Sequence, residues 1–453
     1  MKKESLCLVL SFMTCVCYGQ SNSRMSLREC IDYALERSEV LKQSECREQL
    51  NKLQLNDSKM NFLPDLYLNV NQNFNFGRGL LEDNTYGNQT LSNTNFGISS
   101  SITLFDGLSN FYTKKREKLN YLASQQTSLK EKDNLTISII TLYLQVLLNR
   151  ELYKMASEQL NFSTVQIENT KNLVEQGKKS NTELLEVESQ VAKDKLNLIQ
   201  AKNNLQLSLF NLAQKIDYED YKVFDVLESN ISEMLNDNDI LLLTPDDIYL
   251  NAYSNMAIIN ENKLILESYK KDINIAKASY FPTISLNLQY NNNYYHNFHL
   301  SNYQENISFK NQFKNNGGEI ISLSFSYPLF DKNKARNSVK RAKMNYIIKQ
   351  SEMIETEKQL MKDVQDSHLN AILSKEKYNA AEIAVHALKS HFEQIRNRYE
   401  LGKSNFYDYN ESKNNLLQSM FELTQAKYDY AFRLIILEFY NSSEAKIVVR
   451  SDI

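Results

Sequence analysis

Residues 64–77 read PDLYLNVNQNFNFG, and from Leu66 onward apolar and polar side chains alternate. One set of positions is almost entirely apolar, and the set between them is dominated by asparagine. Successive side chains of a β-strand point to opposite faces, so a period of two predicts a strand with one apolar and one polar face. This stretch therefore indicates a sheet that separates water from an apolar medium.

The same alternation occurs three more times, at residues 96–104, 284–291 and 321–327. Strands of ~10–12 residues are long enough to cross a bilayer in a tilted β-barrel, and polar faces of Asn, Gln, Ser and Thr suit a water-filled lumen. Two β-hairpins are expected, at about 65–106 and 283–331. An antiparallel sheet in a soluble sandwich is the alternative. Four strands cannot close a barrel alone, whereas three chains would supply twelve.

The rest of the chain is predicted to be helical. Neither proline nor glycine occurs between Gly107 and Gly177, which allows a helix of ~105 Å, and residues 332–401 are equally uninterrupted. Helices are also expected at 26–62 and 244–281. Apolar residues recur every seven positions in both halves, which favours supercoiled helix packing. They are Leu184, Val191, Leu198, Leu205 and Leu212, and Tyr409, Leu416, Leu423, Tyr430 and Leu437. An isolated coiled coil would not carry alternating strands in mid-chain.

The chain contains the same unit twice. Residues 26–68 align without gaps with 244–286, and 104–212 align with 329–437. The sequence Leu-Phe-Asp recurs at 104–106 and 329–331, and Gly-Lys recurs at 177–178 and 402–403. The predicted division is a first repeat over 20–230 with its tip near 177, a second repeat over 231–440 with its tip near 402, and a disordered tail over 441–453. An irregular linker is expected at about 217–243.

The N-terminus reads as a secretion signal over residues 1–19, with cleavage expected after Gly19. A lipoprotein would need Cys15 or Cys17 as the acylated residue, but neither follows a small residue. Cys30 and Cys46 remain after cleavage, and both are expected to be buried small hydrophobes. No run of about 18 apolar residues follows the signal, so no transmembrane helix is expected.

Composition argues against several classes of protein. The net charge of −3 and the lack of a basic block argue against nucleic-acid binding. The five histidines have no spacing suited to a metal site, and His296 and His299 are expected in a surface loop. No catalytic cluster and no cofactor motif is present, so we expect a protein that is not an enzyme and uses no cofactor or metal.

An acidic pair follows each glycine of the predicted tips at the same steps. Glu183 and Glu186 lie six and nine positions after Gly177, and Asp408 and Glu411 lie at the same steps after Gly402. Spacing of i, i+3 places both carboxylates on one helix face. Acidic residues also stabilise a helix N-terminus, so helix-start stabilisation remains an alternative to a functional site.

These features together resemble the TolC family of outer-membrane efflux proteins. The resemblance rests on the signal, the opening SLRECIDYALERSEVLK, the LFDG strand exit, the twin glycine-centred hairpins and the duplication, and it covers about residues 25–440. It implies a mainly α-helical homotrimer whose twelve-stranded outer-membrane β-barrel, with four strands per chain, continues as a coiled-coil tunnel across the periplasm.

The resemblance also implies roles for residues at the tips. Asp408 and Glu411 match acids that ring the family's channel constriction, and Tyr399 and Glu183 match a hydrogen bond that holds the closed tip. Gly177 and Gly402 would form the tip turns. The family often adds a basic residue to this lock where Ser404 stands here, and Lys403 or Lys179 could replace it.

The function implied is a passive exit duct in the cell outer membrane, opened by a periplasmic adaptor and an inner-membrane transporter. The exported substrate and the particular pump cannot be deduced, and a protein-secretion or metal-export system would use the same duct. A non-conducting envelope-spanning scaffold is the alternative, although it would not need a polar lumen. A secreted enzyme would need a catalytic cluster that the sequence lacks.

Overall fold

The computed structural model describes residues 24–80, 85–228, 235, 239–298 and 305–442. The predicted signal at 1–19 lies outside this part of the chain, as do residues 443–453 of the predicted tail. Asn441 and Ser442, which were placed in the tail by sequence, belong instead to the last helix.

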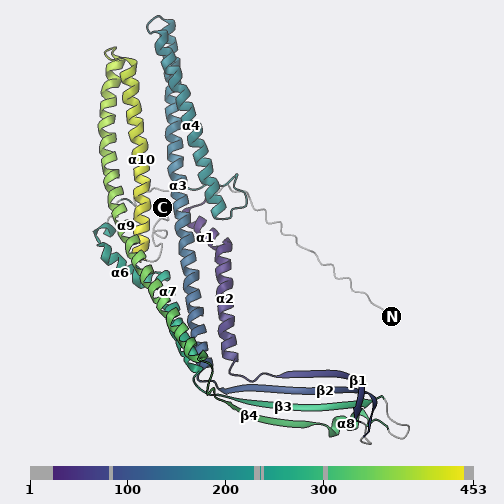
Figure 1. Ribbon diagram of the computed structural model, residues 1–453. Helices are drawn as coiled ribbons and strands as arrows, with labels where there is room; N and C mark the ends of the chain where they lie inside the picture. The colour runs from purple at the N-terminus through teal and green to yellow at the C-terminus, as the bar shows by residue number, and fades with distance from the viewer. Residues whose placement is uncertain (1–23, 81–84, 229–234, 236–238, 299–304, 443–453) are drawn as a thin grey trace, which may run out of the picture.

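Two long helical hairpins dominate the molecule, and a sheet lies crosswise at their lower end (Figure 1). The first hairpin pairs α3 (Ser109–Glu175) with α4 (Asn181–Lys215), and the second pairs α9 (Lys334–Glu400) with α10 (Phe406–Ser442). α3 and α9 each contain 67 residues, or ~100 Å of continuous helix. The absence of helix breakers in the sequence is thus realised as two unbroken rods.

One four-stranded antiparallel sheet combines strands from both repeats in the order β1-β2-β3-β4. Its strands are β1 (Tyr67–Leu80), β2 (Tyr86–Phe105), β3 (Thr283–Asn297) and β4 (Gly318–Ser326). The register places Leu68 opposite Ile98, which is itself opposite Tyr290, and places Asn69 in the neighbouring row. Apolar residues therefore share one face, and β1 and β4 form the two edges.

The helices before each strand pair begin with the same cap. Ser26 and Glu29 form a capping box at α1 (Leu27–Arg37), and Thr244 and Asp247 form one at α6 (Pro245–Asn255). A capping box satisfies two backbone N–H groups that a helix start leaves without partners. The duplication thus repeats the local chemistry that starts a helix.

Each of the single helices predicted at 26–62 and 244–281 is in fact two helices, and that part of the prediction was wrong. α1 is followed by α2 (Glu39–Met60), and α6 is followed by α7 (Ala257–Ala278). The breaks fall at Ser38 and Met256, which have extended backbone angles and occupy equivalent places in the two repeats. Neither break has a glycine or proline to reveal it.

The repeated Leu-Phe-Asp motif starts the long helices. The Asp106 carboxylate accepts a hydrogen bond from the Asn110 N–H at 2.8 Å, and the Asp331 carboxylate accepts one from Ala335 at 2.6 Å. Gly107 has a φ of +69°, and a β-carbon there would lie 2.5 Å from the Ala278 carbonyl oxygen. The motif therefore caps the helix just after the chain leaves the sheet.

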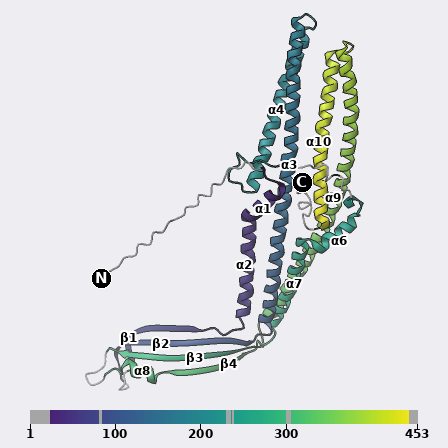
Figure 2. The same cartoon turned by 180° about the vertical axis from the view of Figure 1, so that it is seen from behind.

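The main core lies where the helices of both repeats meet, midway along the molecule (Figure 2). Tyr143 of α3 is 2% exposed and donates a hydrogen bond of 2.9 Å to the Leu227 carbonyl group. Arg150 donates to the Val226 carbonyl group at 2.7 Å. These contacts tie the segment after α4 onto α3. A short 3-10 helix, Asp239–Leu242, lies within the predicted irregular linker.

Within the described residues, α3 contains one stretch that is apolar and long enough to cross a membrane by composition alone. The stretch is not an uninterrupted run of about 18 apolar residues, because Thr141, Gln145 and Asn149 fall among its apolar side chains. In that stretch 44% of the residues are buried inside the protein, and Ile139, Tyr143 and Val146 belong to the main core. A buried core helix has the same composition, which explains its apolar character.

Candidate functional site: the paired hairpin tips

Each hairpin turns at its glycine by the same pair of hydrogen bonds. Gly177 and Gly402 have φ of +69° and +68°. The next residue, Lys178 or Lys403, donates its backbone N–H back to the last helical turn, at 2.8 and 2.7 Å. This arrangement is a Schellman motif, which requires a left-handed residue and thus favours glycine.

The second helix of each hairpin starts at a polar cap. The Ser180 hydroxyl accepts a hydrogen bond from the Glu183 N–H at 3.2 Å, and the Asn405 side chain accepts one from the Asp408 N–H at 2.8 Å. Ser404 also donates to the Asp408 carboxylate at 3.0 Å. Glu183 and Asp408 thus occupy the first turn, where a negative charge stabilises the helix.

The two tips are joined by three side chains. The Tyr399 hydroxyl, from the end of α9, donates a hydrogen bond of 2.7 Å to Glu183 Oε1 at the start of α4. Lys179 Nζ donates to the same Glu183 oxygen at 2.5 Å and also to the Tyr399 hydroxyl oxygen. The Lys179 and Glu183 side chains are each only 19% exposed. The contact is therefore a partly buried, charge-assisted link between the two hairpins.

Of the two lysines that could replace the missing basic residue, the structure places Lys179 in this contact. Its ammonium group also lies 4.5 Å from the centre of the Tyr399 ring. Lys403 is exposed, and Ser404 bonds Asp408 within its own hairpin. The family's basic residue would lie at Ser404, in the second hairpin, whereas Lys179 lies in the first hairpin.

An aromatic cluster lies beneath the polar link. The Tyr399 ring stacks on the Tyr409 ring with centroids 4.8 Å apart, and Phe406 packs beside both. Val187 of α4 is 1% exposed and belongs to the same cluster. Burial raises the pKa of Tyr399 above its ordinary value of 10.0, and the neighbouring Glu183 raises it further, so the hydroxyl remains a donor at neutral pH.

Asp408 and Glu411 lie on the exposed surface of α10, and Glu186 lies on the exposed surface of α4. Asp408 and Glu411 are one helical turn apart, which places both carboxylates on one face near the tip. In a single chain this face is open to solvent. Asp408 lies in the first turn of α10, where its negative charge stabilises the helix start.

Sequence reasoning missed a buried lysine in the second hairpin. Lys413 is 6% exposed, and its ammonium group lies 3.9 Å from the ring centre of Phe162 in α3. Burial lowers the pKa of Lys413 from 10.5 to about 8, and nearby Asp194 of α4 opposes this shift. Asp194 accepts hydrogen bonds of 2.9 Å from Gln159 and Gln190. The Lys413 ammonium group thus lies between the two hairpins, and no carboxylate of the described residues forms an ion pair with it.

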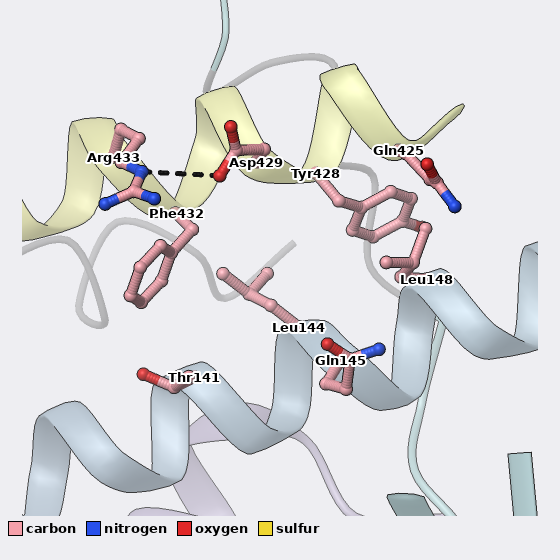
Figure 3. Close-up of a pocket in the computed structure, with 9 residues that line it drawn as sticks. All are labelled: Thr141, Leu144, Gln145, Leu148, Gln425, Tyr428, Asp429, Phe432 and Arg433. Carbon is pink, nitrogen blue, oxygen red and sulfur yellow. Dashed lines mark hydrogen bonds and ion pairs between the residues drawn. The ribbon is translucent and has the colours of Figure 1, made fainter. Parts of the chain in front are cut away.

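A pocket lies at the middle of the molecule, where α10 passes α3 (Figure 3). Its volume is about 230 Å³. Leu144 and Phe432 line its floor and Arg433 pairs with Asp429 at its rim, at 3.3 Å. Leu144 is 33 residues, or ~50 Å of helix, from Gly177. The cavity therefore belongs to the joint between repeats and not to the tips.

The histidine, cysteine and acidic side chains are the groups that could form a metal or thiol site in the described residues. Among them, no group of three or more His, Cys, Asp or Glu side chains could hold a metal ion. Cys30 is buried, and burial raises its thiol pKa to about 12. Cys46 is exposed, so its predicted burial was wrong. α2 packs on α3 along one face only, which leaves Cys46 on the other.

Comparison with known proteins gives one family and several similar folds. The sequence profile of the outer membrane efflux proteins matches residues 30–216 and 251–440. No curated protein sequence matches the chain. A membrane protein from Pseudomonas aeruginosa has 15% identity and a TM-score of 0.79, with 92% of each chain covered. The outer membrane protein VceC of Vibrio cholerae has 14% identity and a TM-score of 0.74, covering 92% of this chain and 96% of VceC. The CmeC outer membrane channel of Campylobacter jejuni has 16% identity and a TM-score of 0.73, covering 94% and 88%.

Proposed function

Because this chain belongs to the outer membrane efflux protein family, we propose that it forms the exit duct of a tripartite efflux or type I secretion system. The barrel end lies in the outer membrane, and the helical tunnel lies in the periplasm. The observation that carries the proposal is the union of one two-faced sheet with two helical hairpins, each built on a helix of ~100 Å, that contact each other at their tips.

Closure of the barrel requires three copies. The single chain presents β1 and β4 as edges, and lipid cannot satisfy their backbone groups. Joining β4 of one copy to β1 of the next gives twelve strands with the apolar faces outward and the asparagine-rich faces around a lumen. A periplasmic adaptor and an inner-membrane transporter would then engage the other end and open it.

We infer that the contact of Tyr399, Glu183 and Lys179 holds the tips in the closed state. A partly buried hydrogen bond to a charged group contributes roughly 1.5–3 kcal/mol, and three copies would act together. Asp408 and Glu411 of three chains would surround the throat, where six carboxylates concentrate cations and repel anions. Helix-start stabilisation is the alternative role for these acids, and the selectivity of the channel distinguishes the two.

Conductance of the purified full chain in planar lipid bilayers tests the proposal. A duct with a closed tip should give small, cation-selective steps, and paired substitution of Tyr399→Phe with Glu183→Gln should enlarge them. A trimer that inserts into the bilayer but conducts in neither form would instead be a scaffold.

A further inference from the structure

A short helix lies at the far end of the sheet, where β3 outlasts its neighbour. The last residue pair between β3 and β4 is Asn291 with Gly318, whereas β3 continues to Asn297. α8 (Phe309–Asn315) lies within the predicted hairpin at 283–331 and packs on β3. The sequence did not reveal this helix, because seven residues are too few to establish a helical period.

Polar side chains fasten α8 to the part of β3 that β4 leaves unpaired. Gln312 donates to the Tyr295 carbonyl group at 2.7 Å and accepts from the Tyr295 N–H at 2.8 Å. Asn292 donates to the Phe313 carbonyl group at 2.6 Å. Gln312 and Asn292 are 7% and 0% exposed. α8 is therefore a fixed part of the sheet's edge.

The aromatic side of α8 covers the apolar face of the sheet. The Phe309 and Phe313 rings contact Phe96 at centroid distances of 6.2 and 5.8 Å. Phe96 is paired with Val70 of β1 and so lies in the apolar set of side chains. Phe309 and Phe313 nevertheless remain 50% and 41% exposed. Since the apolar face of a barrel faces lipid, α8 lies on the outside of the barrel, and the exposed parts of the two rings are open to lipid.

The height of α8 matches the boundary of the bilayer. Asn292 is nine residues beyond Thr283, or ~30 Å along the strand and ~23 Å along the normal at the usual tilt. That is about the height of the apolar band of a barrel, so α8 lies where hydrocarbon gives way to headgroups. Exposed aromatic residues continue six residues farther along the strands, where Phe76 and Phe298 lie beside Thr90 and are 77% and 56% exposed.

Two lysines of α8 adjoin its aromatic side. Lys310 and Lys314 are exposed, and neither forms an ion pair with another residue of the described chain. Glu305 and Glu319 flank the helix and balance its charge, so any attraction to anions must come from local contact and not from a long-range field. An apolar side next to a basic side is typical of helices that lie in a membrane interface.

We propose that α8 is an interfacial anchor on the outside of the barrel, with Phe309 and Phe313 among the upper acyl carbons and Lys310 and Lys314 against the phosphates of outer-leaflet lipids. This inference rests on the proposed function, because the lipid-facing surface of the proposed barrel is continuous with this helix, and the lysines complement the charge of lipid phosphate. The anchor would fix the height and tilt of the trimer at its outer rim, far from the tips.

The absence of tryptophan from the chain permits a direct test. Phe309→Trp and Phe313→Trp would each place one fluorophore in the full-length trimer, reconstituted in phosphatidylcholine–phosphatidylglycerol vesicles. Lipids brominated near the headgroup should lower the emission of both by about half, as expected for a ring at the acyl boundary. Tyr407→Trp, at a hairpin tip ~100 Å of helix away from the sheet and 69% exposed in the wild type, is the control and should change little.

Two results would overturn the inference. If both tryptophans are quenched no more than that of Tyr407→Trp in intact trimers, the helix faces water, the lumen or a neighbouring copy. A second comparison tests the lysines. Because Lys310 and Lys314 would attract an anionic headgroup, brominated phosphatidylglycerol should quench Phe309→Trp better than brominated phosphatidylcholine. This preference should fall by up to about fivefold for each charge removed in Lys310→Gln and Lys314→Gln. An unchanged preference would refute the contact with phosphate.

Discussion

The hydroxyl group of Tyr399 lies 2.7 Å from the carboxylate of Glu183, although 216 residues separate them in the chain. Tyr399 ends the rising helix of the second hairpin, and Glu183 begins the descending helix of the first. One hydrogen bond therefore reports whether the two tips are together.

Tyr399→Phe should raise the basal conductance of the channel. The ring would still stack on Tyr409, but its donor to Glu183 would be lost, at a cost of roughly 1–3 kcal/mol per copy. Single-channel recording should show the open state populated at least about fivefold more often. Tyr407→Phe is the matched control, since Tyr407 is 69% exposed. Equal conductance in the two variants would remove the hydroxyl from the closing contact.

Lys179→Met should also loosen the tip, whereas Lys403→Met should not. Lys179 contributes bonds to both Glu183 and Tyr399, while Lys403 is exposed. Methionine keeps most of the aliphatic stem of lysine and removes its charge. The comparison of conductance separates a local lock from a general effect of tip charge, because each variant changes the net charge equally. If Lys403→Met opens the channel as much, charge alone governs closure.

Paired substitution of Asp408→Asn and Glu411→Gln should weaken the preference of the channel for cations. The six carboxylates of a trimer would no longer attract cations to the throat. Reversal potentials in a salt gradient measure this preference, and high salt should reduce the difference because it screens charge. Glu186→Gln is the control on α4. Unaltered selectivity would leave Asp408 and Glu411 as ordinary residues of a helix start.

Lys413 should make the packing of the hairpins stronger as pH rises from about 8 toward 10. Its pKa is about 8 when packed and 10.5 when exposed, so the packed state binds fewer protons in this window. Stability therefore increases with pH there, by on the order of 3 kcal/mol when fully realised. Thermal unfolding of the trimer across this window should show the rise, and Lys413→Met should abolish it.

Two tyrosines of the tip cluster have the opposite effect on stability at higher pH. Tyr399 and Tyr409 have pKa values raised by burial, that of Tyr409 to about 12. Exposed tyrosine ionises near 10, so these groups begin to destabilise the packed state above that pH. Asp194 faces Lys413 from α4. A pH response that persists in Lys413→Met would therefore assign the effect to other groups.

The two faces of β3 should differ in their tolerance of charge. Leu286→Arg would place a guanidinium in lipid at a cost of about 2–4 kcal/mol near the midplane, whereas Asn287→Arg would face the lumen. Leu286 is paired with Ile102 and Leu323, in the apolar row. The yield of membrane-inserted trimer should fall for Leu286→Arg alone. Equal damage from both would reverse or abolish the assigned orientation.

The strands and long helices could be predicted because their physical constraints are simple. A bilayer imposes a period of two on the strands, and Leu68 and Asn69 already show it. The breaks at Ser38 and Met256 could not be predicted, because ordinary residues adopt extended angles there under tertiary contacts. The capping of those helices is local, and Ser26 with Glu29 does have the sequence pattern of a capping box.

The candidate site also contains residues that could be predicted from the sequence and residues that could not. The family resemblance pointed to Glu183 and Tyr399, whose positions it counts from Gly177 and Gly402. The choice between Lys179 and Lys403 required the three-dimensional arrangement. Lys413 offered no signal, since a lysine beside an apolar repeat normally lies in solvent, and only the neighbouring hairpin buries it.

The two unpaired edges of the sheet have a consequence for inheritance. Each chain needs a sound β1 and a sound β4, because every copy would be held by both of its neighbours. A proline that blocks one edge would spoil any ring that includes it. In a cell expressing normal and altered chains equally, random mixing would leave only about one ring in eight free of the altered chain. Edge mutations would thus act as dominant alleles, whereas mutations that stop a chain from folding would remain recessive.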